Sequence, residues 1–377
     1  MRKPAESSAE LGALHHGSHS NLLTDAEPGV AARLDAIVVP TARPVGELGH
    51  VMALSRSVGC PVVVLCSRET NAASAVSLAN RLDAAVLAVD VDASFARVLP
   101  HFAADRLLRP HALGTTSDTS LKRNLGLALA RGAGWERILF LDDDIIVDRP
   151  ADLPRVAGLL DEFRAVGLAN TGFADNSVVC HAHRAVGGSQ DTFIGGGAMM
   201  VKTSATRSFF PNIYNEDWFF LLGDGVPFRA ARAGQMRQRA FDPFANPRRA
   251  AAEELGDTLA ESLFWLLDFG QSPDTAVNGF WGEALYRRRQ FIDHIHARAD
   301  RTPTPARIRQ SLEAARGRSA LISHRLCEDF LGAWRADLAT WRDFLDWVPV
   351  SSDPAKFAWE VGMSGRLHRS NKMIAAT

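Results

Sequence analysis

The chain has 377 residues, of which 46% are hydrophobic and 23% are charged. These values are ordinary for a protein with a hydrophobic core, and the length fits one large domain with an accessory part. The formal net charge of -1 provides no overall basic field, so neither nucleic acid nor an anionic membrane is expected as a partner. No apolar run reaches the ~18 residues of a membrane span, and the N-terminus lacks the apolar core of a signal peptide.

The four cysteines are spread along the chain, at Cys60, Cys66, Cys180 and Cys327. None forms a CxxC pair, and an extended run between Cys60 and Cys66 would hold these two too far apart for a disulfide. Free buried thiols in a reducing compartment are therefore predicted, which makes the cytoplasm the expected location.

Residues 1–33 have a different composition from the rest of the chain. They are rich in Ser, Ala, Glu and His without a period, and contain the cluster His15-His16-Gly17-Ser18-His19. Such a cluster could bind a stray metal ion, but its surroundings predict a disordered N-terminal tail.

Residues 34–248 contain four short apolar runs, most of them rich in β-branched residues. They are Ala36–Pro40, Val62–Cys66, Ala84–Val91 and Arg137–Leu141. Continuous runs of this length are typical of strands covered on both faces, as in a parallel sheet. Helical stretches lie between them; the clearest begins near Thr119 or Ser120, where a hydroxyl can cap the helix, and ends at Gly132 and Gly134. The alternation predicts a doubly wound α/β domain with a mostly parallel sheet.

After about Arg248 no further strand is expected. Apolar residues follow helical spacing there, first at Leu255, Leu259 and Leu263 and later at Phe330 and Trp334. Residues 249–350 are therefore predicted to form a C-terminal helical accessory region, and residues 351–377 a C-terminal tail.

Three consecutive carboxylates follow the last apolar run. Asp142, Asp143 and Asp144 come directly after Leu141, at the strand end where open α/β sheets bind ligands. Adjacent anions repel one another, and a divalent cation removes that cost. Mg²⁺ and Mn²⁺ prefer oxygen ligands, commonly one or two carboxylates with phosphate oxygens and water. We therefore predict a metal ion held by Asp142 and Asp144; the alternative is a solvated acidic loop.

Two cations begin the helix that precedes the acidic run. Lys122 and Arg123 lie in its first turn, beside Asn124, where the helix dipole favours acids instead. An anionic ligand such as a diphosphate would explain this inversion, and a solvated helix start is the alternative. A further candidate is Gly195–Gly197, because glycines let a backbone come close to a sugar ring; a plain turn is the alternative.

Two acids adjoin aromatic residues in the segment Asn215-Glu216-Asp217-Trp218. Apolar neighbours raise the pKa of a carboxylate and exclude water, which suits a general base. The alternative is a helix start with Asn215 as the cap and the acids in the first turn.

The order of these motifs resembles that of GT-A fold glycosyltransferases, most of all the family 2 type. The resemblance covers roughly residues 35–245 and depends on order and spacing rather than on one motif. The motifs, in chain order, are Pro40-Thr41-x-Arg43, Lys122-Arg123-Asn124-x-Gly126, Leu141-Asp142-Asp143-Asp144, Gly195-Gly196-Gly197 and Asn215-Glu216-Asp217-Trp218.

The resemblance implies a metal-dependent glycosyltransferase that uses a nucleotide-diphosphate sugar donor and a hydroxyl acceptor that the sequence does not identify. Asp142 and Asp144 would bind Mn²⁺ or Mg²⁺. Asp217 would be the catalytic base of an inverting reaction, with Glu216 beside it. The residues expected to contact the donor are Pro40, Thr41, Arg43, Lys122, Arg123, Asn124, Asp143, Gly196, Gly197 and Trp218.

The sequence also departs from this family. Ala42 stands where the family often has an aromatic or polar residue, and the second strand ends at Cys66 without the aspartates that commonly contact the nucleobase. The nucleobase is therefore not predicted, and no third metal ligand is assigned. His181 and His183 would share one face of a strand and are candidates, although each is more simply a loop or helix-surface residue.

Three other functions fit parts of this pattern. A retaining synthase of the mannosylglycerate or glucosyl-phosphoglycerate type would use a similar fold. A sugar-phosphate nucleotidyltransferase would need a glycine-rich loop after the first strand, where this chain has only Gly46 and Gly49. A non-catalytic nucleotide-sugar-binding module would have no use for repelling carboxylates at Asp142, Asp144 and Asp217.

Overall fold

In the computed structural model of the protein, the described residues are 14–92, 95, 97–111, 113–114, 117–223, 229–277, 279–351, 353–360 and 364–375. The strands are β1 (Leu23–Asp25), β2 (Ala36–Thr41), β3 (Val62–Cys66), β4 (Val86–Asp90), β5 (Arg137–Leu141), β6 (Ile145–Ile146), β7 (Ala165–Asn170), β8 (Ala198–Lys202), β9 (Ala230–Gln238) and β10 (Leu367–Arg369). The α-helices are α2 (Gly49–Val58), α3 (Ala72–Arg81), α4 (Ala103–Leu108), α5 (Thr119–Gly132), α6 (Leu153–Gly158), α7 (Val178–Ala185), α8 (Glu216–Gly223), α9 (Pro247–Asp268), α10 (Phe280–Ala299), α11 (Ala306–Ser319), α12 (His324–Trp347), α13 (Pro354–Glu360) and α14 (Asn371–Ala375).

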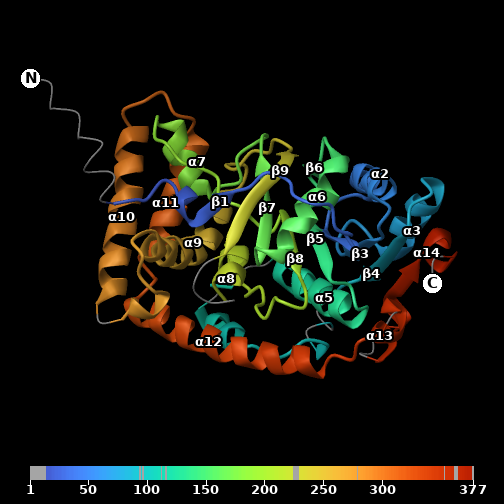
Figure 1. The fold of residues 1–377 in the computed structure, drawn as a ribbon. Coiled ribbons are helices and arrows are strands. Elements are labelled where there is room, and N and C mark those ends of the chain that lie inside the picture. The colour runs from blue at the N-terminus through green and yellow to red at the C-terminus, as the bar shows by residue number, and fades with distance from the viewer. Residues whose placement is uncertain are drawn as a thin grey trace, which may run out of the picture.

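The strands of the described residues form a ten-stranded sheet in the order β1-β9-β7-β8-β5-β2-β3-β4-β10, with β6 paired to β9 (Figure 1). Strands β5, β2, β3 and β4 run parallel, as do β1, β9 and β7. Strand β8 lies between these two groups and is antiparallel to both of its neighbours. The expected α/β architecture with a mostly parallel sheet is confirmed, and the direction of β8 is its main irregularity.

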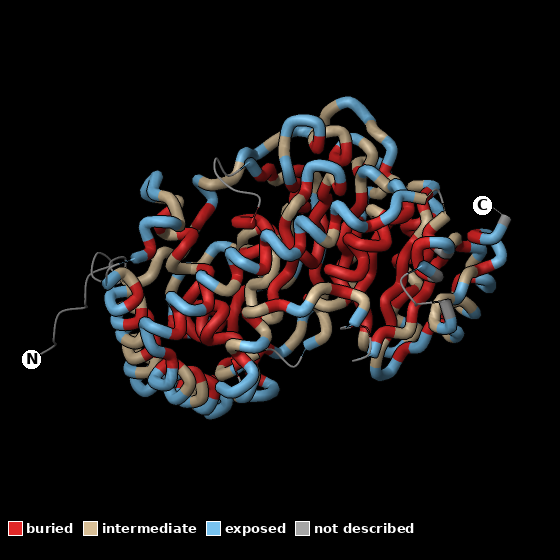
Figure 2. The backbone as a smooth tube through the Cα atoms, turned by 90° about the horizontal axis from the view of Figure 1, so that it is seen from below, coloured by how far each residue is buried: buried red, intermediate tan, exposed pale blue. Residues whose placement is uncertain are grey.

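Both faces of the sheet are covered. Alternate residues of a strand belong to two separate buried clusters, with Val38 and Val63 in one and Val39 and Val64 in the other. Helices α2, α3 and α6 cover one face, and α4, α5, α8, α9 and α12 cover the other. Burial on both faces is why these strands read as continuous apolar runs. Figure 2 shows buried backbone in the interior of the molecule and exposed backbone around its outside.

Helix α5 lies directly against the sheet. A Cβ atom at Gly126 would lie 2.5 Å from Cγ1 of Val38, so this glycine allows the helix to approach β2. The predicted hydroxyl cap is wrong: Asp118 is the N-cap residue, and no side chain caps the helix. Ser120 lies inside the helix and donates a hydrogen bond to the Pro211 carbonyl (2.8 Å), because its side chain faces the neighbouring loop rather than the helix end.

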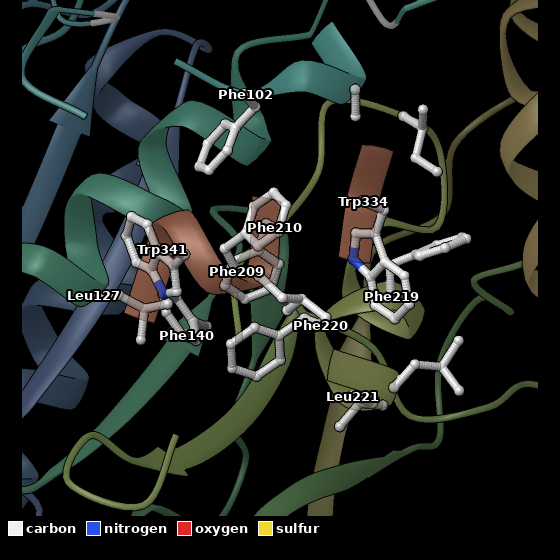
Figure 3. Close-up of a cluster of buried hydrophobic side chains, with 14 of the residues drawn as sticks. Phe102, Leu127, Phe140, Phe209, Phe210, Phe219, Phe220, Leu221, Trp334 and Trp341 are labelled. Carbon is white, nitrogen blue, oxygen red and sulfur yellow. The ribbon is translucent and has the colours of Figure 1, made fainter. Parts of the chain in front are cut away.

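The helical region beyond α8 shares its core with the sheet. Trp334 and Trp341 of α12 pack among phenylalanines of the sheet domain, and Phe219 of α8 meets Trp334 at 5.2 Å between ring centroids (Figure 3). Since one buried cluster contains residues from both sides of position 248, the helices add to the core of the sheet domain. None of the described helices is long and apolar enough to cross a membrane.

The N-terminal segment differs from its prediction. Residues 1–13 lie outside the described residues, but residues 14–25 pack against the domain, and β1 pairs in parallel with β9 at one edge of the sheet. Arg232 of β9 holds Asp25 through two hydrogen bonds of 2.7 and 3.0 Å. The expectation of a disordered tail over residues 1–33 is therefore wrong for this part, because backbone pairing needs no hydrophobic period.

The C-terminal segment differs in the same way. Strand β10 pairs antiparallel with β4, so strands do not end at position 248 and residues 364–375 are not a free tail. Buried Ser370 accepts a hydrogen bond from the Val86 N–H and donates one to the Ala84 carbonyl, both at 2.9 Å. As predicted, the four cysteines are buried and free.

Candidate active site

The sheet topology brings three predicted motifs to one edge. Because β8 is antiparallel to β5, its first residue, Ala198, pairs with Leu141, the last residue of β5. The glycines before β8 therefore lie beside the acids after β5, and the Asp142 N–H donates to the Gly197 carbonyl at 2.8 Å. Helix α8, which begins with Glu216 and Asp217, completes this edge.

The three aspartates of the acidic run are held by different partners. Asp143 is buried; it accepts hydrogen bonds from the Thr41 hydroxyl (2.7 Å) and from Arg43 (2.7 Å). Arg43 also pairs with Asp144 at 2.9 Å. Burial and the negative charge of Asp142 raise the pKa of Asp144, although Arg43 acts against them. The predicted metal ligands Asp142 and Asp144 thus pair with separate arginines, because a turn follows β5.

Arg123 joins the acidic run to the acidic pair of α8. Its guanidinium donates to both oxygens of Asp142, at 2.9 and 3.1 Å, and to Glu216 at 2.5 Å. The Arg123 side chain is 4% exposed, so these ion pairs are largely shielded from water. The anions that explain the cation at the start of α5 are therefore carboxylates of the protein itself, which the sequence did not indicate.

The three glycines before β8 leave room for charged side chains. A Cβ atom at Gly195 would lie 2.8 Å from Oδ2 of Asp217, and one at Gly197 would lie 3.2 Å from Oδ2 of Asp142. A Cβ atom at Gly196 would overlap the guanidinium of Arg123. The glycines are thus required by the ion-pair network, whether or not a ligand approaches them.

The acidic pair at the start of α8 is held in two different ways. Asp217 accepts hydrogen bonds from the N–H groups of Gly196 (2.7 Å) and Trp218 (2.9 Å), whereas Glu216 pairs with Arg123. Burial raises the pKa of Glu216 to about 8 and outweighs the attraction of Arg123. Burial also raises the pKa of Asp217, against the same arginine and its two backbone donors. Both acids are therefore more easily protonated than exposed carboxyls, as the apolar surroundings predicted.

Three other predicted residues support the wall of the site. Lys122 is 1% exposed and donates to the Thr41 carbonyl (2.8 Å) and to Ser67 (2.7 Å), so it joins the ends of β2 and β3. Asn124 exchanges two hydrogen bonds of 2.8 Å with the backbone of Phe210. Pro40 lies inside the sheet, paired with Leu65.

A cavity of about 740 Å³ lies over this edge, a size typical of small-molecule sites. Six predicted residues line it: Arg123, Asp142, Gly197, Glu216, Asp217 and Trp218. The other predicted residues do not line it: Pro40, Thr41, Arg43, Lys122, Asn124, Asp143, Asp144 and Gly196. The cavity thus contains the acidic pair and one of the two predicted metal ligands.

Several charged residues of the cavity were missed by the sequence analysis. Asp175 follows β7 and lines the cavity; surrounding protein and the charges of Asp217 and Asp142 raise its pKa to about 6. Helix α9 contributes a row of acids, Glu253, Asp257 and Glu261, at every fourth residue. Such spacing places side chains on one helical face, so the sequence could have predicted an acidic face on this helix. Nothing in the spacing indicated that this face lines a cavity.

The predicted His-x-His pair lies elsewhere. His181 and His183 are on helix α7 rather than on a strand, so they do not share one face. Burial lowers the pKa of each to about 4. Neither lines the cavity, and neither is a ligand candidate for the acidic run.

Similarity to known proteins is found among solved structures. No family model matches the chain, and no curated protein matches it. Among solved structures, the chain is similar to a mannosyltransferase from Pyrobaculum calidifontis in complex with GDP-Man and Mn²⁺. The two are 14% identical with a TM-score of 0.42, over 86% of this chain and 87% of that one. A TM-score this low does not establish a shared fold.

Proposed function

We propose that the chain is a glycosyltransferase of the GT-A type, which moves a sugar from a nucleotide-diphosphate donor to a hydroxyl acceptor. One observation carries the proposal: Arg123 connects the acidic run after β5 with the acidic pair of α8 on the wall of one cavity. Transfer of a sugar requires a group that stabilises the leaving diphosphate and a base for the acceptor, and these acids can supply both functions.

The donor diphosphate is proposed to lie between the acidic run and the start of α5. Thr119 and Ser120 of this helix line the cavity, and its first N–H groups and positive dipole end favour a phosphate. Arg68, from the loop after β3, lines the same cavity. Two independent cationic features thus support a phosphate position beside Asp142.

Mn²⁺ or Mg²⁺ is proposed to be held by Asp142 and Asp144. The donor set fits: both groups are hard carboxylate oxygens, and the charge of Asp142 raises the pKa of Asp144, so a cation relieves an existing repulsion. The ion pair of Asp144 with Arg43 is replaceable, because the Arg43 side chain is 48% exposed. A bound ion would offset the charge that develops on the departing nucleoside diphosphate.

Asp217 is proposed as the catalytic base. Each of its oxygens accepts one backbone hydrogen bond, which fixes the carboxylate and leaves lone pairs for a proton. The acceptor hydroxyl oxygen attacks the anomeric carbon and gives its proton to Asp217. The bond between that carbon and the donor phosphate oxygen breaks, and its electron pair leaves with the nucleoside diphosphate. Glu216 is not proposed as the base; it accepts a hydrogen bond from Arg123 and holds this guanidinium beside Asp142.

A pair of variants tests the base. Asp217→Asn should lower turnover by about 10²-fold or more at saturating donor, with little change in donor affinity, because a base acts only in the transition state. Glu216→Gln keeps the hydrogen-bonding shape and should affect acceptor affinity more than turnover. Asp217→Asn turning over at the wild-type rate would exclude Asp217 as the base and the inverting reaction with it.

A second pair tests the metal. A panel of nucleotide sugars is added to the protein with and without Mn²⁺, and binding is read as a rise in melting temperature. Asp144→Asn should remove the Mn²⁺-dependent part of the rise. The matched control is Asp148→Asn, since Asp148 pairs with Arg237 on the exposed surface nearby. Equal nucleotide binding with and without EDTA would contradict the metal assignment.

A further inference from the structure

A second group of potential metal ligands lies apart from the acidic run. His16 and His19, from the N-terminal segment, meet Asp268 at the end of α9, and one ligand atom of each lies within 4.8 Å of the other two. Among the described residues, these three form the group of His, Cys, Asp or Glu side chains close enough together to hold one metal ion. None of the three belongs to the donor site proposed above.

Both ring nitrogens of His19 face carboxylates. Its Nε2 lies 3.1 Å from Oε2 of Glu261, so Nε2 carries the proton when Glu261 accepts it. Nδ1 lies against Oδ2 of Asp268. Although burial opposes it, hydrogen bonds to Asp268 and Glu261 raise the pKa of His19 to about 9, so without a metal a proton fills this position, and a bound cation would replace that proton. A carboxylate behind the second nitrogen of a histidine is the usual arrangement around protein-bound metals.

Asp268 supplies the second observation. Its side chain is 3% exposed, and Oδ1 has no hydrogen-bond partner, which is costly for a buried carboxylate. Nε2 of His16 lies 3.0 Å from Oδ2 of the same carboxylate without forming a hydrogen bond of acceptable geometry. The two imidazole nitrogens thus converge on a buried carboxylate whose bonding capacity is incompletely used.

We infer that His16, His19 and Asp268 form a Zn²⁺ site. Two imidazole nitrogens and one carboxylate oxygen suit Zn²⁺, whereas Mg²⁺ and Mn²⁺ prefer oxygen ligands throughout. Glu261 accepts a hydrogen bond from Nε2 of His19 and so orients the ring, with Nδ1 toward the metal. The fourth position is available to water or to the second oxygen of Asp268.

The site would fasten the N-terminal segment to the catalytic domain. His19, Ser20 and Leu23 form part of the cavity wall, and the ring of His19 lies edge-on to Trp218 with centroids 5.3 Å apart. The segment is otherwise held by strand β1, by a hydrogen bond from the Asp191 N–H to the Gly17 carbonyl (2.8 Å) and by the stacking of His15 on Phe291. A metal that binds the folded state only would stabilise this wall by mass action.

The test uses the full chain stripped of metal, with no nucleotide present. Zn²⁺ alone is titrated by calorimetry and by thermal shift, with Mg²⁺ as a parallel arm. We expect one Zn²⁺ per chain, a rise in melting temperature and no such rise with Mg²⁺. Co²⁺ in place of Zn²⁺ should give the visible absorption of a nitrogen- and oxygen-ligated ion.

Variants connect this binding to the cluster. His16→Ala should weaken Zn²⁺ binding by more than about 100-fold, because it removes a direct ligand. The matched control is His15→Gln, since His15 stacks on Phe291 (4.0 Å) and contacts Gln190 rather than Asp268. Glu261→Gln keeps all three ligands and should weaken binding by about 10–100-fold, the usual effect of a partner behind the metal.

Three results would overturn the site. Wild-type protein that binds no Zn²⁺ would mean that a proton joins His19 to Asp268. Equal affinity in wild type and His16→Ala would place the ion elsewhere. If His16→Ala fails to fold, an unchanged Zn²⁺ affinity of Glu261→Gln would also place the ion elsewhere. None of these measurements uses a nucleotide sugar, so their failure leaves the proposed glycosyltransferase unaffected.

Discussion

Removal of the Arg123 guanidinium is the sharpest perturbation of the site. In Arg123→Met, the carboxylates of Asp142 and Glu216 lose the cation that joins them. Breaking a buried ion pair by removing one partner costs about 3–5 kcal/mol. Because the Asp142 side chain is 33% exposed and Glu216 is 14% exposed, water screens part of this cost, and about 3 kcal/mol is expected.

This loss of free energy of unfolding corresponds to a measurable fall in the melting temperature. Unfolding entropy of about 2.1 cal/mol/K per residue gives roughly 0.8 kcal/mol/K for a 377-residue chain, so the midpoint should fall by about 4 °C. The matched control is Arg207→Met. Arg207 also makes two short bonds, of 2.6 and 2.7 Å, to Asp346, but this pair is exposed and should be worth at most about 1 kcal/mol.

The loss should also depend on pH. Burial holds the pKa of Glu216 near 8, above its value in the unfolded chain, and removing Arg123 raises it further. A group whose folded pKa is raised contributes stability at low pH that is lost as pH rises through the folded pKa. Glu216 is mostly protonated below about pH 7 with or without Arg123, so the deficit of Arg123→Met should grow as pH rises through about 8, and Glu216→Gln in the same chain should recover part of it. A deficit equal to that of Arg207→Met, or one independent of pH, would refute the proposed role of Arg123.

Two packing predictions follow from the fold. Gly256→Ala in α9 should lower the melting temperature although alanine favours helices, because the new Cβ would overlap the carbonyl oxygen of Tyr214; Gly332→Ala in α12, with open space around it, should instead stabilise by up to about 1 kcal/mol. A gain in both variants would contradict the close approach. Ser370→Ala should cost about 1–3 kcal/mol in chemical denaturation, since the buried Val86 N–H loses its acceptor, and no loss would mean that β10 does not hold the sheet edge.

The candidate site was partly predictable. Its acids were identified because Asp142 follows a continuous apolar run, and Glu216 and Asp217 stand among aromatic residues at a helix start. Both signals are local, since they depend on neighbours in sequence. The role of Arg123 was not predictable, because its partners lie 19 and 93 residues away and pairing across such distances depends on the fold.

The sequence by itself determined the central parallel strands and helix α5, because burial on both faces of a sheet requires continuous apolar residues in each strand. It did not determine that β8 runs antiparallel to β5, which alone brings Gly197 beside Asp142. The edge strands β1 and β10 also depended on tertiary structure. Each has three residues, and their backbone hydrogen bonds to β9 and β4 carry no side-chain pattern. Strand direction and edge pairing are decided by contacts between distant segments, whose free energy no short stretch of sequence contains.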